Sequence, residues 1–176
     1  MWGGQGVSTL SAGPIRTARL DLVPLLVEHA EEMAEVLSDP ALHTFIGGTP
    51  DTPQALRSRY ARMTAGSPDP DVSWLNWVVR LREGACPTGT VQATVGHSDQ
   101  GASAEIAWVV GTAWQGRGIA SEAARGLVDW LGRRSVRTVV AHIHPEHRAS
   151  AAVAVAAGLS PTGIRHEGEV QWRRDL

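Results

Sequence analysis

Lysine is absent from this chain of 176 residues, in which all 16 basic side chains are arginines. A P-loop nucleoside triphosphatase needs a lysine on the phosphates, and a pyridoxal-phosphate enzyme needs a lysine for its Schiff base. Both mechanisms are therefore excluded in their usual form. Cys86 is the only cysteine, which excludes an internal disulfide and favours a reducing, cytoplasmic location.

Net charge and hydropathy limit the classes of partner that this protein is expected to bind. The formal net charge is −2, whereas a dedicated nucleic-acid binder is usually strongly basic, so we expect no nucleic-acid partner. No apolar run approaches the roughly 20 residues that cross a bilayer, so we expect no membrane partner. Residues 1–13 are rich in glycine and serine and lack the basic and apolar regions of a signal peptide, which predicts a flexible N-terminal tail. Residues 14–176 are predicted to form a single domain.

Hydrophobic periodicity predicts alternating strands and helices in that domain. The predicted strands cover residues 18–26, 74–81, 90–96, 104–110, 136–143, 162–164 and 169–173. The predicted helices cover 28–37, about 53–65, about 118–134 and 149–157. This order, β-α-α-β-β-β-α-β-α-β-β, favours an α/β (α+β) fold with one mixed sheet.

The segment that carries most chemical information is the glycine-containing turn 114–118, between the strand 104–110 and the helix that follows. The first N–H groups of a helix lack intrahelical partners, and the helix dipole places partial positive charge there. Gly116 and Gly118 have no Cβ, so a diphosphate can approach the backbone closely. Two alternatives stay open: a tight turn without a ligand, and a dinucleotide site, although Ser121 stands where that motif has glycine.

Gln115, Gly118 and Ala120 fit the pattern Gln/Arg-x-x-Gly-x-Gly/Ala, which resembles the pyrophosphate loop of the GNAT superfamily of N-acetyltransferases. Three further segments resemble the branch of this superfamily that contains the ribosomal-protein N-terminal acetyltransferases: Arg19–Leu25, Glu105–Trp108, and Ile143–Ser150 followed by Ala157–Leu159. The resemblance covers roughly residues 17–176. It implies a mostly antiparallel sheet splayed between the fourth and fifth predicted strands, a bulge at the opening, helices on both faces and a possible homodimer.

The resemblance also implies the reaction. Acetyl-CoA is the expected acyl donor, no metal is expected, and a primary amine attacks the thioester directly. That amine is a protein N-terminus or a small-molecule amine. An N–H near Val109 or Val110 is expected to face the thioester carbonyl. The residues expected to bind the coenzyme are Trp108, Val109, Val110, Gln115, Gly116, Arg117, Gly118, Ile119, Ala120, Ser121, His147 and Ser150.

Two residues are the catalytic candidates. An amine must lose a proton to be acylated, and the resemblance implies that Glu105 is the general base, since the family often has a glutamate at this point of its fourth strand. Desolvation beside the splayed strands is expected to raise its pKa. Ser150 matches the serine of the branch, and the resemblance implies that it hydrogen-bonds the sulfur. The alternatives are an exposed strand glutamate and an ordinary serine in the first turn of a helix. Glu122 is a rival base, although an acidic residue in a first helical turn also suits the helix dipole.

Two departures from the family pattern weaken the catalytic interpretation. Ala154 occupies the position of the usual tyrosine acid, and His147 occupies that of an asparagine. They motivate the alternative of a non-catalytic acyl-CoA-binding or regulatory module; a third hypothesis is another donor, such as succinyl-CoA. His142, His144 and His147 also suggest a metal site, but no cysteine lies near them.

The sequence leaves the acceptor open among a protein N-terminus, an amino acid, a polyamine and an antibiotic amine. Asn76 and Arg80 lie on one face of their predicted strand. They are acceptor-contact candidates, with the alternative that they are ordinary surface residues of the sheet.

Overall fold

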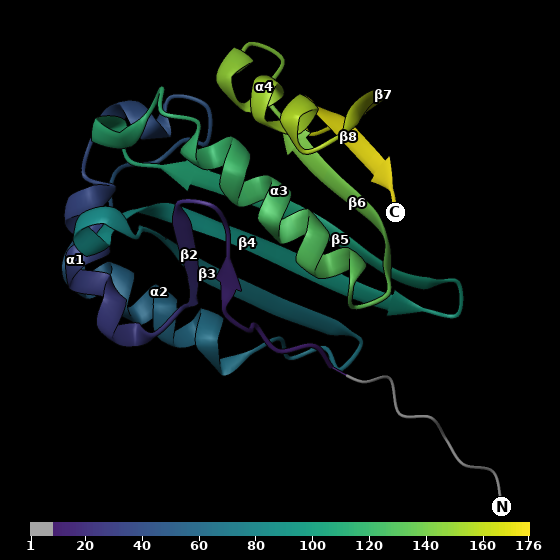
Figure 1. Ribbon diagram of the computed structural model, residues 1–176, viewed down its shortest axis with the longest axis horizontal. Coiled ribbons are helices and arrows are strands. Elements are labelled where there is room, and N and C mark those ends of the chain that lie inside the picture. The colour runs from purple at the N-terminus through teal and green to yellow at the C-terminus, as the bar shows by residue number, and fades with distance from the viewer. Residues whose placement is uncertain (1–8) are drawn as a thin grey trace, which may run out of the picture.

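The computed structural model describes residues 9–176, which form one sheet in the strand order β1-β2-β3-β4-β5-β6-β8-β7 (Figure 1). All neighbouring strands are antiparallel except β5 and β6, which run parallel. The strands are β1 Ile15–Arg16, β2 Leu20–Pro24, β3 Val72–Leu81, β4 Cys86–Ser98, β5 Gly101–Val110, β6 Val136–Ile143, β7 Ser160–His166 and β8 Glu169–Asp175.

Four α-helices accompany the sheet within this range. They are α1 Ala30–Val36, α2 Pro53–Ala65, α3 Ile119–Gly132 and α4 Arg148–Ala156, together with 3-10 turns at Val27–His29, Pro40–His43, Glu83–Ala85 and Thr112–Trp114. The start of α2 shows why a helix forms there. Thr52 accepts a hydrogen bond from the Ala55 N–H at its side-chain oxygen, and Pro53 occupies the first turn.

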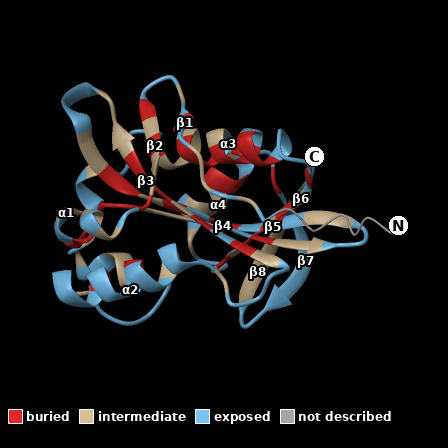
Figure 2. Cartoon of the chain, turned by 90° about the horizontal axis from the view of Figure 1, so that it is seen from below, coloured by how far each residue is buried: buried red, intermediate tan, exposed pale blue. Residues whose placement is uncertain are grey.

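The predicted order of strands and helices is confirmed, as is the α/β class with a mixed sheet. The sequence missed β1 and the 3-10 turns, which are too short to carry a periodic signal. It also made β4 too short, because residues 86–89 and 97–98 lack the alternation that marks a half-buried strand. The predicted placement of helices on both faces is confirmed: Figure 2 shows α3 and α2 on opposite sides of the sheet.

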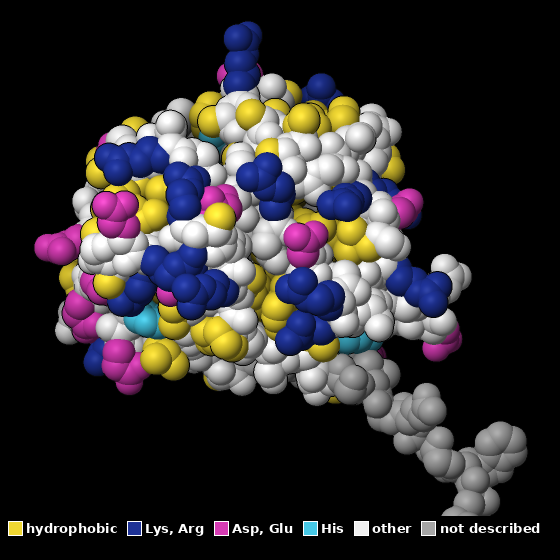
Figure 3. All heavy atoms as spheres, in the orientation of Figure 1, with side chains coloured by type: hydrophobic (Ala, Val, Ile, Leu, Met, Phe, Trp, Pro, Cys, Tyr) yellow, Lys and Arg dark blue, Asp and Glu magenta, His cyan; other side chains and the backbone are white. Residues whose placement is uncertain are grey.

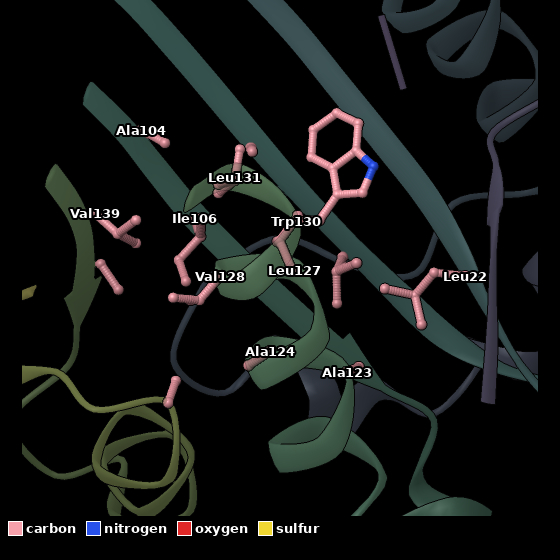
Figure 4. Packing of buried hydrophobic residues seen from close by; sticks show 14 of the residues in the cluster. Leu22, Ala104, Ile106, Ala123, Ala124, Leu127, Val128, Trp130, Leu131 and Val139 are labelled. Atoms are coloured by element: carbon pink, nitrogen blue, oxygen red, sulfur yellow. The ribbon is translucent and has the colours of Figure 1, made fainter. Parts of the chain in front are cut away.

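The larger core lies between α3 and the sheet. Leu127, Val128 and Leu131 of α3 are buried in one cluster with Ile106 and Val139 of the sheet (Figure 4). A Cβ on Gly126 would lie 2.7 Å from Cγ2 of Thr17, so this helix approaches the start of the sheet as closely as glycine allows. The close packing that the interior glycine predicted is therefore present.

A smaller core lies on the opposite face, under α1 and α2. It contains the buried residues Leu25, Ala30, Met33, Leu56, Tyr60 and Val78. Val78 belongs to this core, whereas Trp77 and Val79 belong to the larger one, because successive side chains of β3 alternate between the two faces.

The sequence predicts a flexible tail over residues 1–13. The first eight of these residues lie outside the part of the chain that the structure describes. Leu10 donates its N–H to the Ser73 hydroxyl at 3.1 Å, and the Gly13 carbonyl accepts a hydrogen bond from the Trp77 indole at 2.7 Å. These two residues therefore lie against β3. No helix within residues 9–176 combines the length and apolar character needed to cross a membrane.

Candidate functional site

The sheet opens between β5 and β6, the fourth and fifth of the predicted strands. Their last paired residues are Glu105 and Val140, although β5 continues to Val110 and β6 to Ile143. The expected splay is thus confirmed. The bulge expected at the opening is wrong, because β4 and β5 keep one register as far as the pair of Gly89 and Val110, and the register shift between β5 and β6 lies earlier, between Ala102 and Ser103. The opening arises because β5 stays with β4, while β6 stays with β8 as far as Ile143.

Gly89 allows the backbones of β4 and β5 to approach closely at the end of their pairing. A Cβ at this position would lie 2.1 Å from the Val109 carbonyl oxygen, well inside van der Waals contact. Any larger residue would push β5 away from β4 where the coenzyme is expected to bind.

A cleft of about 830 Å³ occupies the opening, within the range of small-molecule sites. It is bordered by the end of β5, the turn before α3, the end of β6, the start of α4 and the segment after the Pro40–His43 turn. Every residue expected to bind the coenzyme lines it except Arg117, whose guanidinium carbon lies 5.1 Å from the centre of the Trp114 ring.

The turn into α3 leaves backbone N–H groups free at one edge of this cleft. Gly116 and Gly118 have φ values of 76° and 74°, in the left-handed region that favours glycine. The first helical hydrogen bond is donated by Glu122 to the Gly118 carbonyl at 3.1 Å, and Gly118 has no side chain with which to cap the helix. The N–H groups of Ile119 to Ser121 therefore have no intrahelical acceptor.

Two side chains hold the turn in place. Gln115 donates from its amide nitrogen to the Val110 carbonyl at 3.0 Å, which ties the turn to the end of β5. Arg19 donates from its guanidinium to the Arg117 carbonyl at 3.0 Å. The first contact gives Gln115, a residue of the motif, a structural role that its sequence position does not reveal.

Glu122 belongs to this support and not to the reacting centre. Its carboxylate accepts from the Arg19 guanidinium at 2.8 Å, from the Arg19 backbone N–H at 2.9 Å and from the Thr17 hydroxyl. Burial opposes its ionisation, but the hydrogen bonds from Thr17 and Arg19 outweigh this effect and lower the pKa of the carboxyl. An ionised, fully engaged carboxylate is a poor proton acceptor, so the rival base is set aside.

Glu105 lies at the last paired position before the strands part. Its carboxylate oxygen is 2.9 Å from Nδ1 of His142, a residue of β6 that borders the cleft. The Glu105 side chain is 56% exposed and that of His142 only 15%. The expectation of a desolvated glutamate is therefore wrong: the carboxyl group reaches solvent, and its histidine partner is the more buried member of the pair.

The start of α4 forms the far wall of the cleft. The Ser150 hydroxyl is 3.4 Å from Nε2 of His147, and burial together with the neighbouring His144 lowers the pKa of His147. The ring of Phe45 stacks on His147 with 4.4 Å between ring centres and lies 5.0 Å from His144. Sequence analysis missed Phe45, whose only signal is that it is the sole phenylalanine.

The three histidines have separate roles. His142 contacts Glu105, His144 accepts a hydrogen bond from the Glu146 N–H at 3.1 Å, and His147 contacts Ser150. Within residues 9–176 no three potential ligands gather to hold a metal ion. Ala154 is fully buried in the core, so the position of the usual tyrosine supplies no proton donor.

A second cavity, of about 200 Å³, lies between α1, α2 and the sheet. It is lined in part by Asn76 and Tyr60; burial raises the pKa of Tyr60 to about 12, so its phenol is neutral. Arg80, the other acceptor-contact candidate on β3, lies outside this lining and forms an ion pair with Glu32 at 3.0 Å.

The site thus combines a parallel pair of strands that part with an uncapped helix N-terminus beside the opening. Residues 19–160 match the family model of the acetyltransferase (GNAT) domain. The chain belongs to the GNAT acetyltransferase family. No curated protein sequence gives a significant match.

Solved structures with the same fold include enzymes that bind coenzyme A. An acetyltransferase from Agrobacterium tumefaciens is 27% identical, with a TM-score of 0.68 over 97% of this chain and 99% of that one. RimL, a ribosomal L7/L12 alpha-N-protein acetyltransferase in complex with coenzyme A, is 16% identical, with a TM-score of 0.77 over 93% and 98%. The aminoglycoside acetyltransferase AAC(6')-Ib with coenzyme A is also 16% identical, with a TM-score of 0.73 over 89% and 94%.

Proposed function

We propose that this protein is an acetyl-CoA-dependent N-acetyltransferase that transfers the acetyl group to a primary amine. The observation that carries the proposal is the uncapped N-terminus of α3, which opens through two left-handed glycines into the cleft between β5 and β6. The free N–H groups at that helix end suit a diphosphate. Two of the similar structures contain coenzyme A.

The end of β5 offers a hydrogen-bond donor to the thioester. Gly111 donates its N–H to the Thr88 carbonyl of the neighbouring strand at 2.8 Å. Because backbone groups alternate in direction along a strand, the Val110 N–H points to the other edge, toward the opening. The Val110 carbonyl, which accepts from Gln115, points the same way. Of the two residues that the sequence suggested, Val110 is thus the one suited to stabilise the oxyanion.

The reaction needs one nucleophile and one proton acceptor. The lone pair of the neutral amine attacks the thioester carbonyl; a C–N bond forms, the C–S bond breaks, and coenzyme A leaves as a thiolate. The amine proton passes to the base, and the thiolate takes a proton from water or accepts a hydrogen bond from Ser150. No acyl-enzyme is formed, so no nucleophilic side chain is required.

Glu105 and His142 form the base as a pair. Val110 lies five positions after Glu105, roughly 17 Å at the rise of a strand, so proton transfer runs through water. An ionised carboxylate only accepts hydrogen bonds, so the His142 ring donates from Nδ1 and presents Nε2 as its proton acceptor. The carboxylate then stabilises the imidazolium that forms.

Two measurements test the proposal. The melting temperature is recorded with and without acetyl-CoA, and release of free coenzyme A is followed across a panel of primary amines. Ligand at about 100 times its dissociation constant stabilises the fold by about 2.7 kcal/mol, which gives a shift of several degrees. The absence of a shift at millimolar acetyl-CoA contradicts the proposal.

A second candidate function is a non-catalytic acyl-CoA-binding or regulatory module. It is favoured by the buried Ala154, which supplies no acid, and by the solvent exposure of Glu105. A thermal shift without release of coenzyme A for any amine would select this function over catalysis.

A further inference from the structure

The smaller cavity has room for one substituent and not for a whole ligand. Its volume of about 200 Å³ lies below the range of about 300–1,000 Å³ that small-molecule sites occupy. Its walls come from both α1 and α2 and from the sheet beneath them, and they are mostly apolar. The apolar side chains that matter most here are Ala34, Leu37, Leu56 and Met63.

The charged groups in this lining are already neutralised. Asp51 and Arg59 form an ion pair at 3.1 Å, and Tyr60 keeps its proton at neutral pH because its pKa is about 12. An ammonium group inside the cavity would lose its hydration without meeting an unpaired carboxylate, which is unfavourable. Acceptors with several positive charges, such as polyamines and aminoglycosides, are therefore disfavoured.

The cavity opens beside the expected position of the thioester. Five residues line both this cavity and the larger cleft: Leu42, Ile46, Thr90, Gln92 and Val109. Val109 directly precedes the residue whose N–H faces the opening. A substituent seated in the small cavity thus leaves the group to which it is attached at the junction of the two spaces.

Two amide side chains line the small cavity, and one of them, Gln92, also lines the larger cleft. Asn76 and Gln92 are paired across β3 and β4, so their side chains lie on the same face of the sheet, and both line the small cavity. Neutral amides donate and accept hydrogen bonds but do not neutralise charge. They suit a neutral polar group close to the amine, such as a peptide bond.

We infer that the acceptor is an α-amino compound with a neutral amide and an apolar side chain of about leucine size, and that the small cavity receives this side chain. This inference rests on the proposed function and adds the substrate class to it. The amine belongs either to a free amino acid derivative or to the N-terminal residue of a peptide, since the two share this chemistry.

Matched amino acid amides test the substrate class. Coenzyme A release is measured with leucinamide and methioninamide against serinamide and lysinamide. A hydrophobic pocket distinguishes such groups by about 10- to 200-fold, so we expect kcat/KM for leucinamide to exceed that for serinamide at least about tenfold. A tripeptide amide that begins with leucine separates the two sources, because a chain N-terminus is preferred only if the tripeptide exceeds leucinamide.

Variants of the cavity wall test its location. Ala34→Leu fills the cavity and is expected to lower kcat/KM for leucinamide about tenfold relative to alaninamide. Met63→Ala enlarges it and is expected to shift the preference toward phenylalaninamide. Ala61→Leu is the matched control, since Ala61 is exposed on α2 outside the lining. Melting curves confirm that each variant folds, and Met63→Ala keeps the test valid if Ala34→Leu does not.

A measurement of amide binding distinguishes a failure of this inference from a failure of the proposed function. Calorimetric titration of leucinamide and serinamide into the coenzyme A complex does not require turnover. Equal binding of the two amides, or equal effects of Ala34→Leu and Ala61→Leu, would overturn the inference. The proposed function would still stand in that case if other amines were acetylated. If leucinamide binds selectively but no amine releases coenzyme A, catalysis is refuted and the apolar pocket stands.

Discussion

The two sides of the opening between β5 and β6 are built in different ways. The side proposed to bind the coenzyme, the coenzyme side, consists of backbone: two left-handed glycines, the first turn of α3 and the end of β5. The side proposed to bind the acceptor, the acceptor side, consists mainly of side chains from α1, α2 and three strands, which enclose a small apolar cavity. A site made of backbone recognises a group common to many substrates, whereas a site made of side chains selects one substrate class.

The surface that carries α3 supports this distinction. Figure 3 shows its arginines spread among acidic side chains instead of gathered into one large patch. This distribution agrees with the proposal that directed N–H groups and the helix end, more than a broad positive field, bind the coenzyme.

The largest expected effect falls between the two sides, at the base. Glu105→Gln removes the carboxylate that orients His142 and stabilises its charged form, so we expect kcat to fall about 10²- to 10⁴-fold. The affinity for acetyl-CoA should change little, because Glu105 lies outside the lining of the cleft. Steady-state release of coenzyme A gives kcat, and calorimetry gives the affinity.

Glu35→Gln is the control for this change, because Glu35 is exposed on α1 and lies outside both cavities. It should retain full activity. Unchanged turnover in Glu105→Gln would remove the base from the mechanism and leave the acceptor side without a catalytic group.

The next effect concerns the support beneath the coenzyme side. Glu122→Gln weakens three hydrogen bonds to a carboxylate, so the free energy of unfolding should fall by about 2 kcal/mol at neutral pH. The folded-state pKa of Glu122 is lowered, so its contribution is present above the ordinary pKa of 4.5 and is lost as the pH falls through the folded value. The variant should therefore lose less stability than the parent when the pH falls below about 4.5.

Urea denaturation at pH 7 and at pH 3.5 measures both parts of this prediction. Glu31→Gln is the matched control, since Glu31 and Arg57 form an exposed ion pair at 3.4 Å, of a kind that contributes about 0–1 kcal/mol. Equal losses in the two variants would mean that Glu122 is an ordinary surface residue of a helical first turn.

The difference between a site made of backbone and a site made of side chains also explains which parts of the site can be predicted from the sequence. Gly116 and Gly118 lie two positions apart in the chain, and the backbone shape they permit is visible in the residue types themselves. The acceptor cavity joins residues as distant as Ala34, Asn76 and Val109, and no local pattern reports such a meeting. The family resemblance makes Glu105 a candidate, but its contact with His142 depends on the parallel register of β5 and β6, which periodicity does not fix.

The smallest expected effect isolates the backbone of the coenzyme side. Gly116→Ala and Gly163→Ala introduce the same methyl group at φ values of 76° and 82°, and in both places the new Cβ meets no atom within 4 Å. The backbone strain of about 1–2 kcal/mol is therefore common to both variants. Only Gly116 lines the cleft, so only there does the methyl group stand where a diphosphate would approach.

We expect the dissociation constant for acetyl-CoA to rise about tenfold in Gly116→Ala and to stay unchanged in Gly163→Ala, with similar losses of melting temperature. The leucinamide-to-serinamide ratio of kcat/KM should be the same in both, because the acceptor side is untouched. Equal coenzyme affinity in the two variants would show that close approach to Gly116 is not needed, and the backbone account of this side of the opening would fail.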